Sequence, residues 1–78
     1  MPNYELRQAI RQILLGANTA YMSAAEISDA MRSLTPPLHY SAQQIASSIR
    51  LLPEISNDDY QTTFDQDRQI NLYRIIQS

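Results

Sequence analysis

Cysteine and lysine are absent from this chain of 78 residues, and glycine occurs once. Without cysteine the chain can form neither disulfides nor thiolate metal sites, and such a composition suits a reducing compartment. No apolar run approaches the ~20 residues of a membrane-spanning helix, and residues 1–20 lack a basic region followed by an apolar block. We therefore expect a cytoplasmic protein with no membrane contact.

Residues that support catalysis or metal binding are equally sparse. His39 is the only histidine, and it has no second histidine or cysteine with which to hold a metal. Asp65 and Asp67 begin like a calcium loop, but the glycine and the terminal glutamate of such a loop do not follow. No serine lies in a nucleophile elbow, and one glycine cannot build a phosphate loop. We expect no metal, no cofactor and no enzymatic activity.

The charge balance is the next constraint. The formal net charge is −2 and the isoelectric point about 5.0, whereas a dedicated nucleic-acid domain is usually basic. All six basic residues are arginine, whose planar guanidinium makes bidentate contacts to phosphate, guanine or carboxylate. This bias favours specific contacts over a diffuse cationic coat. The length, residues 1–78, allows one small domain.

The middle of the chain contains the same helix-start signal twice. The boxes pair Ser23 with Glu26 and Ser41 with Gln44. In such a capping box each side chain satisfies a backbone N–H that the helix start leaves open. The two signals predict helices over about Ala24–Leu34 and Ala42–Leu52, and a proline follows each of them. Two short capped helices joined by a compact link form a helix-turn-helix candidate.

The flanking segments complete the predicted fold. Apolar residues recur at helical spacing from Leu6 to Ala17, which predicts a first helix that Asn3 caps and Gly16 and Asn18 end. Residues 19–22 form a short extended link. Alternating residues over 60–76, with a turn at 65–68, predict a β-hairpin. The predicted core contains Leu6, Ile10, Ile13, Ile27, Met31, Leu34, Ile45, Ile49, Leu72 and either Tyr60 or Phe64.

This order of elements over residues 6–76 resembles the winged helix-turn-helix superfamily. The resemblance implies an α+β, mainly helical fold: three helices followed by a C-terminal hairpin, the wing. Small stand-alone members are often regulators of bacteria, plasmids and phages. In them the second capped helix usually lies in the DNA major groove, and the wing touches the backbone or the minor groove. This chain departs from the pattern in its long link at Pro36-Pro37, its acidic hairpin and its negative net charge.

The helix at about 42–52 carries most of the candidate binding residues. Glutamine pairs with adenine, arginine with guanine, and serine with a base edge or a phosphate. The first turn of the helix offers free N–H groups to a phosphate, and no acidic residue lies between positions 41 and 52. The predicted DNA-binding residues are Ser41, Gln43, Gln44, Ser47, Arg50 and, on the wing, Arg68. Arg32 or Arg7 would be flanking phosphate contacts. The alternatives for this helix are an ordinary polar face turned to solvent and a protein-binding face.

The acidic hairpin leaves the partner open. Residues 57–78 contain four aspartates and two arginines, and this excess of negative charge works against DNA binding. The predicted function is a DNA-binding transcriptional regulator that acts as a homodimer on a two-fold site. The alternative is a winged-helix protein-interaction module or inhibitor that binds a protein partner through the acidic wing or the exposed helix face. A third class is an architectural domain of a larger complex.

Overall fold

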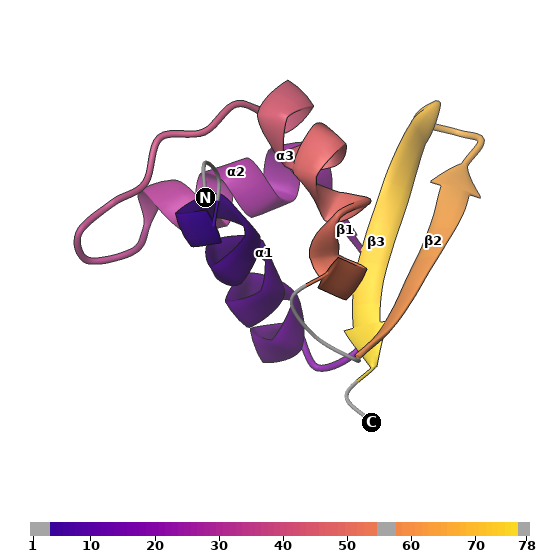
Figure 1. Ribbon diagram of the computed structural model, residues 1–78. Helices are drawn as coiled ribbons and strands as arrows, with labels where there is room; N and C mark the ends of the chain where they lie inside the picture. The colour runs from indigo at the N-terminus through magenta and orange to yellow at the C-terminus, as the bar shows by residue number, and fades with distance from the viewer. Residues whose placement is uncertain (1–3, 55–57, 77–78) are drawn as a thin grey trace.

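The computed structural model describes residues 4–54 and 58–76. In chain order its elements are α1 (Tyr4–Gly16), β1 (Met22–Ser23), α2 (Ala24–Arg32), α3 (Ala42–Ile49), the short 3-10 helix η1 (Leu52–Glu54), β2 (Asp59–Asp65) and β3 (Ile70–Ile76). The strands form one antiparallel sheet in the order β1-β3-β2, and the helices gather on one side of the β2–β3 hairpin (Figure 1). The predicted α+β class, with three helices before a C-terminal hairpin, is confirmed. The predicted cap Asn3 lies outside the described residues.

Both predicted capping boxes are present. Ser23 Oγ accepts the backbone N–H of Glu26 (3.1 Å), and Glu26 Oε1 accepts that of Ser23 (3.0 Å). Ser41 and Gln44 repeat the arrangement at 3.2 and 2.9 Å. Each box satisfies two N–H groups that have no partner within the helix. Local sequence is therefore enough to set where α2 and α3 begin.

The end of α2 differs from the prediction. The helix stops at Arg32, and the backbone N–H of Leu34 turns back to the carbonyl of Met31 (3.2 Å). This turn directs Leu34 outward, where it is 40% exposed, so its predicted place in the core is wrong. Leu38 takes that place: its N–H also donates to Met31 (3.0 Å), and its side chain packs against the core.

The predicted extent of α3 is also too long. The α-helix ends at Ile49 with Arg50 as its C-cap, three residues before the predicted end. Leu52 nevertheless is fully buried, because η1 carries it back into the core. Leu51 between them is exposed. The change from an α-helix to a 3-10 helix thus keeps Leu52 in the core, and Leu51 stays on the surface.

On α1, the buried arc is wider than a single apolar stripe. Arg7, predicted as an alternative flanking phosphate contact, is buried with 7% exposure. The helix contacts α2, α3 and β3 at once, so three neighbours cover parts of it that one packing partner would leave open. Leu14 is buried and Ile13 only half-buried. The helix ends at Gly16, and Asn18 follows with a positive φ of 56°, which confirms the predicted stop.

Strand register decides which hairpin residues face the helices. Tyr60 pairs with Ile75 and Thr62 with Tyr73, so these side chains share one face of the sheet. Ile75 on that face is buried, whereas Leu72 lies on the opposite face and is half-buried, so the core position predicted for Leu72 is wrong. The observed core contains Leu6, Ile10, Leu14, Ile27, Met31, Ile45, Ile49, Leu52 and Ile75.

The two aromatic residues of β2 are separated by their distance from the core. Tyr60 packs against it, as the prediction allowed, but Phe64 near the hairpin turn is 49% exposed. The turn follows Asp65, the last residue of β2, rather than including it, and Gln69 completes it with a φ of 57°. In the described part of the chain no helix has the length and apolar character needed to cross a membrane.

Candidate functional site

The exposed face of α3 brings five of the six predicted contact residues together. Ser41, Gln43, Gln44, Ser47 and Arg50 are all exposed. On the opposite side of the helix Ile45 and Ile49 are buried, with 0% and 6% exposure. Because the side chains of a helix keep fixed angular positions, these two isoleucines set its rotation. The predicted rotation of α3 is therefore confirmed.

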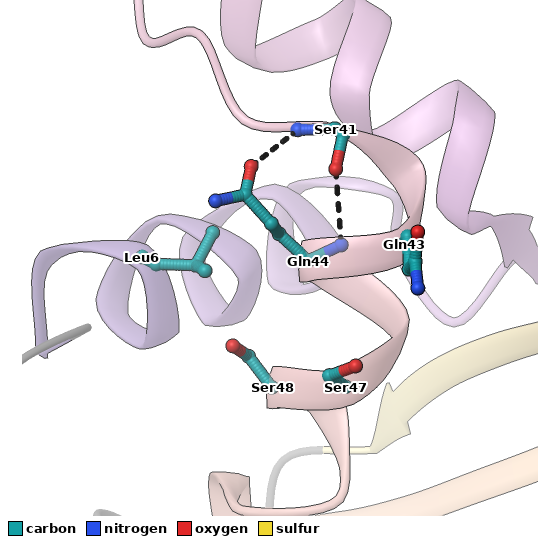
Figure 2. Close-up of a pocket in the computed structure, with 6 residues that line it drawn as sticks. All are labelled: Leu6, Ser41, Gln43, Gln44, Ser47 and Ser48. Atoms are coloured by element: carbon teal, nitrogen blue, oxygen red, sulfur yellow. Dashed lines mark hydrogen bonds between the residues drawn. The ribbon is translucent and has the colours of Figure 1, made fainter.

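Part of this face is turned toward α1. In Figure 2 the side chains of Gln44 and Ser48 lie on the side of α3 nearest Leu6, whereas Gln43 lies on the other side. A hollow of about 280 Å³ opens here, lined by Leu6, Ser41, Gln43, Gln44, Ser47 and Ser48. Gln44 therefore lies on the side of α3 that is turned toward α1, and not on the side that carries Gln43.

A second hollow lies between α3 and the hairpin. It has a volume of about 440 Å³ and is lined by Gln43, Ala46, Ser47, Arg50, Thr62, Asn71 and Tyr73. Gln43, Ser47 and Arg50 stand four and three residues apart, so they form one stripe along the helix. Gln43 and Ser47 border both hollows. They form a polar ridge with a depression on each side.

The hairpin residues of this second hollow were not among the predicted contacts. Thr62 pairs with Tyr73, Asn71 lies on the same face of β3, and α3 lies across the hollow from that face. The sequence offers one signal for this grouping: strand alternation, which places Thr62 on the same face as Tyr60. Which part of the face α3 covers is a tertiary feature.

The helix-start residues retain hydrogen-bond donors. Ser41 Oγ accepts the N–H of Gln44, and Gln44 Oε1 accepts the N–H of Ser41, as the dashed lines in Figure 2 show. The capping box therefore occupies an acceptor on each side chain. The hydroxyl hydrogen of Ser41 and the amide hydrogens of Gln44 are left to donate. This end of α3 is accordingly better suited to an acceptor such as a phosphate oxygen than to the paired donor and acceptor of a base edge.

Arg68, the predicted wing residue, is held by an aspartate of the same hairpin. Its Nε lies 2.8 Å from Asp65 Oδ2, and Asp65 Oδ1 accepts the backbone N–H groups of Asp67 and Arg68. The hydrogen bond from the Arg68 side chain lowers the pKa of Asp65, and the same contact raises the pKa of Arg68. The charge of Arg68 is thus largely compensated within the hairpin.

Other arginines also have partners inside the protein. Arg11 pairs with Asp58 at 2.7 Å, Arg32 pairs with Asp29, and Arg74 lies 4.5 Å from the centre of the Tyr21 ring and donates to Gln61. Arg7 is buried. Within residues 4–54 and 58–76, Arg50 is therefore the one exposed arginine that has no acidic partner. It stands at the end of the stripe on α3.

Side-chain contacts from α1 and α2 hold Tyr40, the residue before the cap of α3. Glu5 accepts the hydroxyl of Tyr40 at 2.8 Å, a bond that raises the pKa of Tyr40. The carbonyl of Tyr40 in turn accepts the Ser28 hydroxyl at 2.7 Å. These contacts tie the residue before the Ser41 cap to both α1 and α2. They position the start of α3.

No protein-family model, curated protein or solved structure matches this chain. Among the residues that the structure describes, no three histidine, aspartate or glutamate side chains gather where they could hold a metal ion. The chemistry on which a function can be argued is therefore that of the ridge on α3: hydrogen-bonding side chains, one uncompensated arginine and two flanking hollows.

Proposed function

We propose that this protein is a winged-helix transcriptional regulator that binds double-stranded DNA, with α3 as the recognition helix. The order of elements supports this reading, because a helix and a short strand precede two capped helices and a hairpin. The central position of β3 lets the hairpin project beside α3 as a wing (Figure 1). In helix-turn-helix proteins the second helix of the pair enters the major groove.

The observation that carries the proposal is the stripe formed by Gln43, Ser47 and Arg50. All three side chains are exposed on one line of α3, and Arg50 is the exposed arginine that no described acid neutralises. The hollows on both sides leave the ridge prominent. A prominent helix ridge with these groups matches the donor and acceptor pattern of the major groove.

Each residue of the ridge has a distinct role in this proposal. Gln43 pairs with adenine, Arg50 with guanine, and Ser47 bonds a base edge or a phosphate. Ser41 and Gln44, whose acceptors are used by the capping box, donate to the DNA backbone at the start of α3. Phosphate contacts fix the register of the helix, and base contacts supply the specificity.

The wing has a secondary role. Arg68 is compensated by Asp65, so it neutralises little phosphate charge. Thr62 and Asn71, which line the hollow beside α3, are better placed to form hydrogen bonds to a backbone that enters there. One copy of the chain offers few phosphate contacts, and we therefore propose that a homodimer binds a two-fold site.

The test is a titration of labelled duplexes followed by fluorescence anisotropy, on a random-sequence pool and on the sequence that selection enriches. Arg50→Ala should weaken binding to the enriched sequence by about 1–3 kcal/mol and binding to the random pool by much less. Arg32→Ala is the matched control. Its guanidinium is exposed but paired with Asp29, so its removal should change both affinities by the same small amount.

Two results would remove the DNA proposal. One is that no duplex binds in a manner that weakens with added salt, since phosphate neutralisation makes DNA binding salt-dependent. The other is that Arg50→Ala and Arg32→Ala alter both affinities equally. Sedimentation of the DNA complex tests the dimer separately, because two copies of the protein per duplex are expected.

A further inference from the structure

In the described part of the chain, the outer edge of β2 from Thr62 to Phe64 offers backbone hydrogen-bonding groups to which no further strand is paired. In the sheet order β1-β3-β2, β2 is the last strand, and all of its seven residues, Asp59–Asp65, pair with β3; within residues 4–54 and 58–76 no strand lies on its other side. Every second residue of an edge strand directs its N–H and C=O away from the sheet. Such an edge can accept one further strand by main-chain hydrogen bonds alone.

Side chains form two rows along this edge. Strand alternation places Tyr60, Thr62 and Phe64 on the face that meets the helices, and Phe64 is 49% exposed. Asp59 and Asp65 lie on the other face, at the two ends of the strand. An added strand would thus meet an exposed aromatic ring on one side and carboxylates at both ends on the other.

The acids differ in how far they are compensated. Asp58 and Asp65 pair with Arg11 and Arg68. Asp59 and Asp67 are exposed, and in the described part of the chain neither contacts a cation; the side chain of Asp59 accepts only the amide of Gln61, at 2.9 Å. The uncompensated negative charge therefore flanks β2 at its beginning and just after its end.

This arrangement disfavours a second copy of the chain at the edge. Antiparallel pairing of two β2 strands about Thr62 would place Asp59 opposite Asp65 of the other copy. Pairing about Thr63 would place Asp59 opposite Asp67. Like charges directly opposite each other destabilise a strand pair. The charges that repel a second copy attract a strand with basic residues at its ends.

We infer that the outer edge of β2 binds an extended, basic segment of a partner protein by strand addition. The segment has arginine or lysine at both ends, facing Asp59 and Asp67, and β-branched or apolar residues between them that pack beside Thr62 and Phe64. The site uses backbone groups and carboxylates of the hairpin. It does not include Arg50 or any other residue of the α3 ridge, so it stands whether or not the DNA proposal does.

The test uses a labelled peptide of nine residues, Arg-Val-Thr-Val-Thr-Val-Thr-Val-Arg, titrated with the intact protein. A control peptide carries glutamate in place of both arginines. The basic peptide should bind and the acidic one should not. Asp59→Lys should weaken binding by roughly fivefold or more, since it replaces a favourable cross-strand pair with a repulsive one. Asp29→Lys, the same charge change on α2, and Arg50→Ala should leave it unaltered.

Amide hydrogen exchange followed by NMR locates the peptide. On strand addition the amides of alternate β2 residues should exchange more slowly, because the N–H groups that point outward acquire partners. The inference is overturned if neither peptide binds, if both bind equally, or if binding leaves β2 amide exchange unchanged. It is also overturned if sedimentation shows that two copies associate through β2 and that Asp59→Lys strengthens the association.

Discussion

Removing the caps of α2 and α3 in turn should affect stability and DNA binding differently. One variant should lose more stability, and the other should lose more DNA affinity. Ser41→Ala removes the cap of α3, and Ser23→Ala removes that of α2. The hydrogen bonds lost are alike, at 3.2 and 3.1 Å. The surroundings differ, because Ser41 is exposed whereas Ser23 is only 5% exposed and lies in β1, paired with Leu72.

The expected magnitudes follow from this difference in exposure. Loss of an N-cap costs about 1 kcal/mol on average. At position 41 water can replace the lost acceptor, so about 1 kcal/mol is expected. At position 23 burial hinders water, and the cost should approach about 2 kcal/mol. For a domain of this size each kcal/mol lowers the melting temperature by about 4–8 °C.

The assays are urea denaturation by circular dichroism and titration of the enriched duplex under conditions where both variants are folded. Ser23→Ala should be the less stable variant. Ser41→Ala should be the weaker binder, because the proposed phosphate donor lies on Ser41 and not on Ser23.

Equal affinities of the two folded variants would refute the role of Ser41 at the DNA backbone. If Ser41→Ala proved the less stable variant, the link drawn between burial and the cost of a lost cap would be wrong.

Three further substitutions test the core, the acid response and the long-range ion pair. Ile45→Ala, at a fully buried site, should lower the free energy of unfolding by about 2–5 kcal/mol; a neutral result would mean that α3 is turned the other way. Glu26 has a pKa below its ordinary 4.5, chiefly because its carboxylate accepts the backbone N–H of Ser23. This stabilisation is present above the unfolded-state pKa and is lost as the pH falls through the folded-state pKa. Glu26→Gln keeps the box and should flatten that acid-side loss in urea denaturation measured at several pH values; parallel curves for the two proteins would contradict it. Asp58→Asn breaks the 2.7 Å pair with Arg11, whose side chains are 7% and 22% exposed, and should cost about 1–3 kcal/mol. A double-mutant cycle with Arg11→Ala measures the coupling, and zero coupling would show that the pair contributes nothing.

The starts of α2 and α3 were predictable to the residue, and their ends were not. A capping box is a contact between residues three apart, so it forms from local sequence. The end of α2 depends on how the chain turns after Ser33, where Leu38 rather than Leu34 reaches the core. The end of α3 depends on η1, which returns Leu52 to the core after the α-helix has stopped. Apolar periodicity shows which residues can be buried, but several local conformations can bury them.

The candidate site was likewise predictable in part from the sequence. The exposed stripe of Gln43, Ser47 and Arg50 follows from the rotation that buries Ile45 and Ile49, and helical period alone gives that rotation. That Arg50 stands apart from the other arginines does not follow from the sequence. Arg11 meets Asp58 across 47 positions, and Arg7 is buried because α1 has three neighbours. Contacts between residues so far apart in the sequence depend on how the helices and strands pack.

By itself, then, the sequence determined the class and order of the elements, the two helix starts and the outward face of α3, because hydrogen bonds and side-chain periods over a few residues decide these. Only the tertiary structure decided the central place of β3, the open edge of β2, the hollow between α3 and the hairpin, and the compensation of each charge. Strand pairing and ion pairs join residues far apart in the chain, and their partners are selected by the packing of the whole domain rather than by any local pattern.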